Sequence, residues 1–241
     1  MSKDRIPRDT DRASQWARRP LIPPTARPVA GALLTCCVAV TAVLGALFAH
    51  QTHPTWLDRA VDLPIAASLA AHPRAAEMLA YPGEPVPVTA LTVALLVACL
   101  IRRKLNACVL LVVAVPGAIA LSELALKHAV GRKYHDALTF PSGHTTSAFA
   151  VAAAITVLLA DPDQVRLRPA GRALFALIAL LVAAAVAVGV IALDFHYFTD
   201  TVAGAAVGIG SVIATAFVVD HFGRLAQRTR IRKTSIGASP G

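Results

Sequence analysis

The sequence predicts an all-α protein, an integral membrane bundle of six helices with short interfacial helices on the extracytoplasmic side. Of its 241 residues, 56% are hydrophobic and only 15% are charged, which is less charge than a soluble domain of this length carries. Apolar runs long enough to cross the roughly 30 Å hydrocarbon core as helices recur along the chain. The net charge of +9 does not indicate a nucleic-acid partner, because the basic residues cluster between and beyond these runs and no nucleic-acid-binding module is recognisable.

The predicted spans differ in how they are connected and in how closely they can pack. Residues 50–85, between the first two spans, hold short apolar stretches separated by prolines, which indicates amphipathic helices at the membrane interface. In the last span, Gly204, Gly208 and Gly210 allow close approach of a neighbouring helix. The six predicted spans are residues 29–49, about 86–101, about 106–125, about 145–160, about 173–193 and about 199–219.

Charged residues at the ends of the spans predict the topology. Residues 1–27, which are rich in Arg and Pro, are expected to be a disordered basic cytoplasmic tail, and residues 221–241 a second basic cytoplasmic tail. Residues 28–220 then form the membrane domain of a multi-pass protein of the cell (plasma) membrane with both termini in the cytoplasm. Arg102-Arg103-Lys104 and the net basic segment 161–172 mark the same side. The segments expected outside are residues 50–85, 127–144 and 194–198.

Two polar clusters on the predicted outer side form the candidate site. The first, residues 127–144, combines basic side chains, a hydroxyl and a glycine backbone, which together suit a phosphate dianion. Basic residues outside run against the positive-inside rule, and anion binding is a reason for the exception. The second cluster is residues 196–200, and we expect the two to be halves of one site. The candidate phosphate-binding residues are Lys127, Arg132, Lys133, Ser142 and Gly143.

The candidate catalytic residues are two histidines and an aspartate. His196 and Asp200 are four residues apart and share a face if this segment is helical. A carboxylate bound to one imidazole nitrogen fixes the tautomer and leaves the other nitrogen free to attack, while His144 can protonate a leaving oxygen. No metal ion or other cofactor is expected. Glu123 is either an interface-level carboxylate or a partner of a basic residue of the site, and Asp194 is an acid near His196 without an assigned role.

These residues resemble the motifs of the type 2 phosphatidic-acid phosphatase superfamily, in a divergent, bacterial-type membrane form. Its membrane members have six spans and three motifs: Lys, six residues and Arg-Pro; then Pro-Ser-Gly-His; then Ser-Arg, five residues and His-x-x-x-Asp. The second motif is intact as residues 141–144, and the end of the third as residues 196–200. Lys127 and Gly131-Arg132 match parts of the first motif. The resemblance extends from about the second span to the sixth.

The resemblance implies a reaction and a role for each matched residue. The reaction is hydrolysis of a lipid phosphate or diphosphate at the extracytoplasmic interface, so the expected partners are that substrate and membrane lipids. Which lipid is used and the oligomeric state are not specified. His196 would be the nucleophile that forms a phosphohistidine, Asp200 would orient it, and His144 would be the general acid. Phosphate would be bound by Lys127, Ser142 and Gly143.

Two arginines of the family pattern are absent. The Arg-Pro of the first motif falls on Tyr134-His135, and the arginine of the third falls on Val190. Each charge-assisted contact is worth about 1.5–3 kcal/mol, so phosphate binding would need a replacement from Arg132 or Lys133. Two functions remain open: an active lipid phosphate phosphatase, which we favour because the His-His-Asp set is complete, and a catalytically impaired member that binds lipid phosphates or scaffolds partners.

Overall fold

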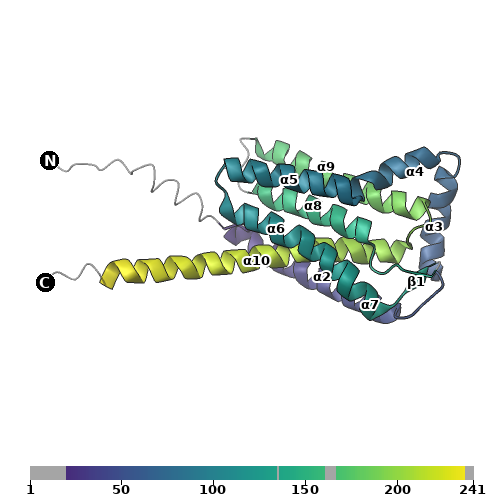
Figure 1. The fold of residues 1–241 in the computed structure, drawn as a ribbon, viewed down its shortest axis with the longest axis horizontal. Helices are drawn as coiled ribbons and strands as arrows, with labels where there is room; N and C mark the ends of the chain where they lie inside the picture. The colour runs from purple at the N-terminus through teal and green to yellow at the C-terminus, as the bar shows by residue number, and fades with distance from the viewer. Residues whose placement is uncertain (1–19, 135, 161–166, 237–241) are drawn as a thin grey trace.

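The computed structural model describes residues 20–134, 136–160 and 167–236, with side-chain surroundings as far as residue 226. Most of the predicted N-terminal tail, His135, the loop residues 161–166 and the last five residues of the chain lie outside this part. Within it the fold is helical except for one short two-stranded ladder, so the predicted all-α class is confirmed. Figure 1 shows the helices running side by side along the length of the molecule.

The helices occur in the following order, with one pair of strands between α7 and α8. They are η1 (Pro24–Ala26), α2 (Arg27–Leu47), α3 (Trp56–Leu69), α4 (Pro73–Ala80), η2 (Tyr81–Gly83), α5 (Pro85–Ile101), α6 (Leu105–Ala120), the π-helical η3 (Leu121–Leu126), α7 (Lys127–Val130), α8 (Gly143–Ala160), α9 (Pro169–Ala192) and α10 (Phe198–Ile236). The antiparallel strands are β1 (Lys133–Tyr134) and β2 (Ala137–Leu138), with Lys133 opposite Leu138.

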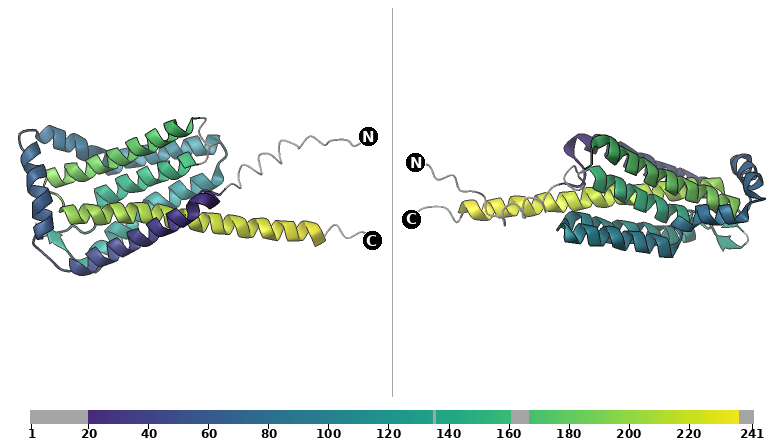
Figure 2. Two further views of the ribbon diagram at one scale, coloured as in Figure 1. Left: turned by 180° about the vertical axis from the view of Figure 1, so that it is seen from behind. Right: turned by 90° about the horizontal axis from the view of Figure 1, so that it is seen from above.

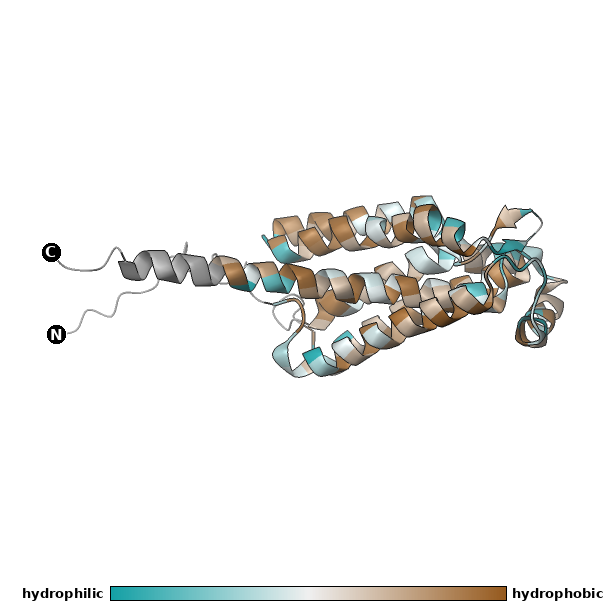
Figure 3. Cartoon of the chain, turned by 90° about the horizontal axis from the view of Figure 1, so that it is seen from below, coloured by the Kyte–Doolittle hydropathy of each residue, from teal (hydrophilic) through white to brown (hydrophobic). Residues whose placement is uncertain are grey.

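Among the described residues, five helical segments are long and apolar enough to cross a membrane. A sixth span is present if α4, η2 and α5, which bend by 42° at residue 84, are counted together. The chain is therefore a multi-pass membrane protein. Its second predicted span, about 86–101, coincides with α5, which passes as a span only together with the bent segment before it. Figure 3 shows hydrophobic residues along the helices and hydrophilic ones gathered where the loops lie. The five segments are residues 24–47, 105–130, 143–160, 169–192 and 198–226.

Helix α8 lies in the core, and α10 packs directly against its backbone. A Cβ added at Gly204 would lie 2.6 Å from the carbonyl oxygen of Ser142, and one added at Gly208 would lie 2.5 Å from that of Thr146. Neither position therefore accepts a side chain, as expected for close helix packing through small residues. Gly210 instead faces Cys37 of α2, which runs beside α10 (Figure 2). This packing aligns the N-terminal ends of α8 and α10.

The N-terminal end of the described chain is more ordered than expected from the sequence. The N–H groups of Leu21 and Ile22 donate to the buried carboxylate of Asp220 on α10 at 2.6 and 3.1 Å, and Arg27 lies 3.7 Å from the same carboxylate. Residues 20–26, assigned to the disordered tail, are thus packed against α10. Helix α10 in turn continues to Ile236, well past the predicted end of its span.

The segment between α2 and α5 forms the short helices that the sequence predicts. Helix α3 lies across the end of the bundle at which α8 and α10 begin (Figure 1). Its N-terminus is closed by a capping box in which Thr55 and Asp58 satisfy each other's backbone N–H groups. Helix α4 then packs on Gly189 of α9, where an added Cβ would lie 2.4 Å from the backbone nitrogen of Ala80. These helices therefore border the end of the bundle that carries the candidate site.

Candidate active site

The two predicted catalytic histidines lie next to each other at the N-terminal ends of α8 and α10. His144 is the second residue of α8, and His196 lies in the turn that precedes α10. Their ring centroids are 6.4 Å apart. The N–H of Ser142 donates to the carbonyl oxygen of Asp200 at 3.0 Å, which ties the two motifs together through the backbone. Segments about fifty residues apart in sequence thus meet in one place, as the sequence analysis expects of a shared site.

Asp200 faces His196 but does not hydrogen-bond to it. Nδ1 of His196 is buried without a hydrogen-bond partner and lies 3.9 Å from Oδ2 of Asp200. This separation is too long for a hydrogen bond, although catalytic contacts are often long in sites without substrate. Oδ2 of Asp200 accepts the N–H of Tyr197 at 3.3 Å, and Oδ1 is bound by Arg132 at 2.6 Å. The carboxylate is therefore held in place by groups other than the imidazole.

The N-terminus of α8 offers backbone N–H groups to an anion. Ser142 caps the helix, since its Oγ accepts the N–H of Thr145 at 3.4 Å, and it is fully buried. Gly143 is the first helical residue. Unpaired N–H groups and the positive end of the helix dipole make such a terminus favourable for phosphate. The candidate binding groups Ser142 and Gly143 are thus adjacent to His144.

Lys127, the expected phosphate ligand from the first motif, is paired with Glu123. Its Nζ donates to Oε2 of Glu123 at 2.8 Å. The other carboxylate oxygen of Glu123 lies so close to Gly143 that a Cβ on this glycine would collide with it. Glu123 therefore spans from Lys127 to the N-terminus of α8. Of the two interpretations of Glu123, the structure favours the partner of a basic site residue.

Arg132, the second expected phosphate ligand, is enclosed in the protein. Its side chain is 0% exposed, and its guanidinium carbon lies 4.6 Å from the ring centroid of Phe48 and 4.5 Å from that of Tyr197. Gly131 turns the chain into this position with a φ of 65°, and a Cβ there would lie 2.8 Å from the imidazole of His50. Arg132 therefore presents no exposed surface to a phosphate. Lys133 differs in being exposed, on β1.

Two acids on α3 belong to the site, although the sequence analysis did not include them. Asp58 accepts the N–H of Thr199 at 3.0 Å, and Asp62 accepts that of Phe198 at 3.1 Å, so both bind the N-terminus of α10. Burial alone would raise the pKa of Asp58, but its hydrogen bonds, among them those from Thr199 and Arg132, lower it below the ordinary value. Burial and then the negative charge of Asp58 raise the pKa of Asp62 to about 7. The one sequence signal was the Thr55-x-x-Asp58 capping pattern.

Comparison with protein-family models matches residues 126–224 to the PAP2 superfamily. Residues 126–224 thus form a PAP2 superfamily region within the chain. The predicted resemblance is confirmed over this region, which runs from the residue before Lys127 to beyond Asp200 but does not include the second predicted span. Searches among curated proteins and among solved structures found no match. The PAP2 superfamily implies phosphatase activity on lipid phosphates in general.

Tyr134 and Val190, which stand where the PAP2 pattern has arginines, both pack against neighbouring groups of the protein. At the first, Tyr134 stacks on Tyr197 with ring centroids 4.6 Å apart and donates its hydroxyl proton to Asp194, which gives this acid a partner. Burial and then that hydrogen bond raise the pKa of Tyr134. At the second, Val190 is 0% exposed and follows the glycine on which α4 packs. Aromatic stacking and helix packing therefore occupy the places where the PAP2 pattern has phosphate-binding cations.

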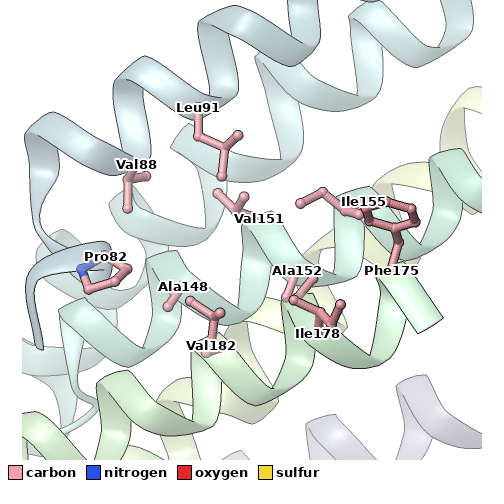
Figure 4. A pocket seen from close by; sticks show the side chains of 12 residues that line it. Pro82, Val88, Leu91, Ala148, Val151, Ala152, Ile155, Phe175, Ile178 and Val182 are labelled. Carbon is pink, nitrogen blue, oxygen red and sulfur yellow. The ribbon is translucent and has the colours of Figure 1, made fainter. Parts of the chain in front are cut away.

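An apolar groove of about 250 Å³ runs along α8 between α5 and α9 (Figure 4). Pro82 and Ala148, which is one helical turn after His144, line one end of the groove, and Phe175 lines the other. The backbone at Gly83, next to Pro82, touches His144, since a Cβ there would lie 3.3 Å from Cβ of the histidine. The end of the groove lined by Pro82 and Ala148 is therefore the end nearer to His144.

Proposed function

We propose that the protein is an integral membrane phosphatase that hydrolyses a lipid phosphate or diphosphate at the extracytoplasmic interface through a phosphohistidine intermediate. The observation that carries the proposal is the pair of imidazoles, with centroids 6.4 Å apart, beside the N-terminus of α8. One ring has a carboxylate behind it and the other does not, which suits a nucleophile and a general acid. The apolar groove beside His144 supports a lipid as the substrate.

The chemistry follows from the two rings. Neutral His196 attacks phosphorus through the nitrogen that does not face Asp200, and the bond from phosphorus to the lipid oxygen breaks. Protonated His144 gives its proton to that oxygen as it leaves. Asp200 stabilises the positive charge that develops on His196. Water then attacks the phosphohistidine, His144 takes up a proton from the water, and inorganic phosphate is released from His196.

The phosphate-binding groups in this proposal are Lys127, Ser142 and Gly143, with exposed Lys133 as a further cation at this end. Charge on the non-bridging oxygens grows in the transition state, so an ammonium and N–H groups of the α8 terminus aimed at them lower the barrier. Substrate phosphate must displace the carboxylate of Glu123 from Lys127, because both anions would use the same ammonium. The dianion carries the greater charge, which favours the exchange.

The extracytoplasmic location is supported by the distribution of basic residues. Helix α5 begins near the histidines and ends at Arg102-Arg103-Lys104, at the opposite end of the bundle. Arg224 lies near the C-terminal end of the apolar segment 198–226 of α10, on that same side. By the positive-inside rule, the end that carries these residues faces the cytoplasm, and the end with His144 and His196 faces outward.

The second candidate function is that of a catalytically impaired member that binds lipid phosphates. It is favoured by one observation: Arg132 is fully buried and paired with Asp58 and Asp200, and neither position of the missing arginines holds a cation. Such a protein would use Lys127 and the α8 terminus to hold a head group without transferring phosphate.

Trapping of the intermediate separates the two functions. The purified full-length chain, in detergent or in nanodiscs, is mixed with radiolabelled lipid monophosphates and diphosphates and quenched in alkali, in which phosphohistidine survives. We expect acid-labile label on the wild type and on His53→Ala, a control at an exposed histidine of the same end of the bundle, and none on His196→Ala. If no lipid phosphate is turned over faster by the wild type than by His196→Ala, the phosphatase proposal is wrong.

A further inference from the structure

Arg132 joins α3 to the N-terminus of α10. Its Nη2 donates to Oδ2 of Asp58 at 2.7 Å, and its Nη1 donates to Oδ1 of Asp200 and to Oγ1 of Thr199, both at 2.6 Å. All three partners are at most 1% exposed. Phe48 packs over one side of the guanidinium. A planar fork that binds two carboxylates at once has one orientation, so both carboxylates are fixed relative to each other.

This arrangement determines which oxygen of Asp200 faces the imidazole. Arg132 binds Oδ1, while Oδ2, which also accepts the N–H of Tyr197, is the oxygen that points toward Nδ1 of His196, at 3.9 Å. Asp58 in turn holds Arg132 from the other side and also accepts two hydrogen bonds from Thr199, the residue before Asp200. Among the described hydrogen bonds and ion pairs, Asp58 of α3 makes none with either histidine. Through Arg132 and Thr199 it nevertheless affects how the Asp200 carboxylate is oriented.

From this geometry we propose that Arg132 is a positioning residue for the Asp200–His196 pair, held in place by Asp58, and not a phosphate ligand. The catalytic consequence rests on the proposed function, whereas the effect on the imidazole does not. Arg132 fixes the Asp200 carboxylate and neutralises part of its charge. Asp58 keeps the guanidinium from being drawn wholly to Asp200.

The charges around the pair set the direction of the expected effects. Two carboxylates and one guanidinium give the buried group a net charge of −1, which favours a proton on His196. Removing the charge of Asp58 makes this environment less negative, so it stabilises the protonated imidazole less. The other titratable or charged groups near the pair are His144 on α8, Asp62 on α3, Lys127 with Glu123, and Tyr134, Tyr197 and Asp194 of the neighbouring loops.

Three variants test the proposal in the purified full-length chain. Asp58→Asn removes one charge and keeps the shape. Arg132→Lys keeps the charge but cannot bridge two carboxylates with one fork. Asp220→Asn is the matched control, because Asp220 is also a buried carboxylate that accepts two backbone N–H groups and lies near an arginine, but at the other end of the bundle. The pKa of His196 is read from the ¹⁵N-histidine NMR signal that His196→Gln lacks, with no need for turnover.

We expect the His196 pKa to fall in Asp58→Asn and to stay at the wild-type value in Asp220→Asn. In Arg132→Lys the pKa should change little, while kcat falls at least tenfold and KM for lipid phosphate stays within twofold. The affinity for orthovanadate, a phosphate analogue, should be retained in Arg132→Lys. A chain without phosphatase activity would overturn the proposed function, yet the NMR titration would still decide the effect on His196.

Two results would overturn the positioning role. One is a His196 pKa that is the same in Asp58→Asn, Asp220→Asn and the wild type. The other is an Arg132→Lys variant that loses orthovanadate affinity, or raises KM, at unchanged kcat, since that pattern belongs to a phosphate ligand. Thermal unfolding of every variant is recorded beside these measurements. A variant that fails to fold is replaced by Thr199→Val, which removes the hydroxyl that hydrogen-bonds to both Arg132 and Asp58.

Discussion

Nζ of Lys127 donates a hydrogen bond to Oε2 of Glu123 at 2.8 Å, one helical turn earlier in the chain. The same carboxylate lies against Gly143, at the terminus of α8 that would receive a phosphate. A carboxylate of the protein therefore occupies the position between two of the expected phosphate-binding groups. Its side chain is 39% exposed, so solvent weakens the pair and a dianion can compete with it.

We therefore predict that Glu123→Gln binds lipid phosphate more tightly than the wild type. The amide removes both the competing partner of Lys127 and a negative charge beside the incoming phosphate, so KM should fall by about 2- to 10-fold. The measurement is the initial rate of phosphate release against substrate concentration. Glu77→Gln, the same change at an exposed acid of α4, is the control and should match the wild type. An unchanged or higher KM in Glu123→Gln would show that Glu123 supports binding.

The rate of hydrolysis should be highest at an intermediate pH. His196 must be neutral to attack, whereas His144 must be protonated to donate, so kcat/KM falls on both sides of an optimum. With a substrate whose leaving group needs no proton, the fall in kcat/KM at alkaline pH should disappear in His144→Ala, while the fall at acid pH remains. The profile of phosphate release across acid to alkaline pH checks this division, and a flat profile in the wild type would contradict it.

Much of the fold, and the proximity of His144 to His196, could be predicted from the sequence for identifiable physical reasons. Apolar runs predict spans because the bilayer fixes their length, and the number of spans then places residues 127–144 and 194–198 at the same end. The small residues at Gly204 and Gly208 indicated the close helix contact that aligns α8 with α10. Local pattern and membrane geometry together were enough to bring His144 near His196.

The direction of Arg132 was not predictable in the same way. Its partner Asp58 is 74 residues away, on a helix whose pattern indicated only an interfacial location. The chain turns inward at Gly131, and a glycine in sequence does not reveal which side chain the turn buries. The packing of α4 beside Val190 is likewise a contact between distant segments. Such features depend on tertiary structure, which residue spacing along the chain does not encode.

Close packing of α8 and α10 predicts a large effect of a single methyl group. Gly204→Ala would place its Cβ 2.6 Å from the carbonyl oxygen of Ser142, so the two helices must move apart at the level of the site. We expect a loss of stability of about 1–3 kcal/mol and at least a tenfold fall in kcat. Gly117→Ala on α6 is the control, because an added Cβ there meets no atom within 4 Å. Thermal unfolding in detergent and phosphate release measure both effects, and equal behaviour of the two variants would contradict the packing argument.

The raised pKa of Asp62 predicts that the free energy of unfolding depends on pH. Burial, and then repulsion by Asp58, raise its pKa from 3.8 to about 7 in the folded protein. The folded state therefore binds more protons than the unfolded state between these values, and the free energy of unfolding falls as pH rises from about 4 to 7. Asp62→Asn removes this penalty while the amide oxygen can still accept the N–H of Phe198. It should stabilise the protein by about 1–3 kcal/mol at pH 8 and have little effect near pH 4.

Thermal unfolding at pH 4 and pH 8 tests this prediction, with Asp136→Asn, at an exposed turn position of the hairpin, as the control. A gain at pH 4 equal to that at pH 8 would show that the aspartate is ionised to the same extent in both states.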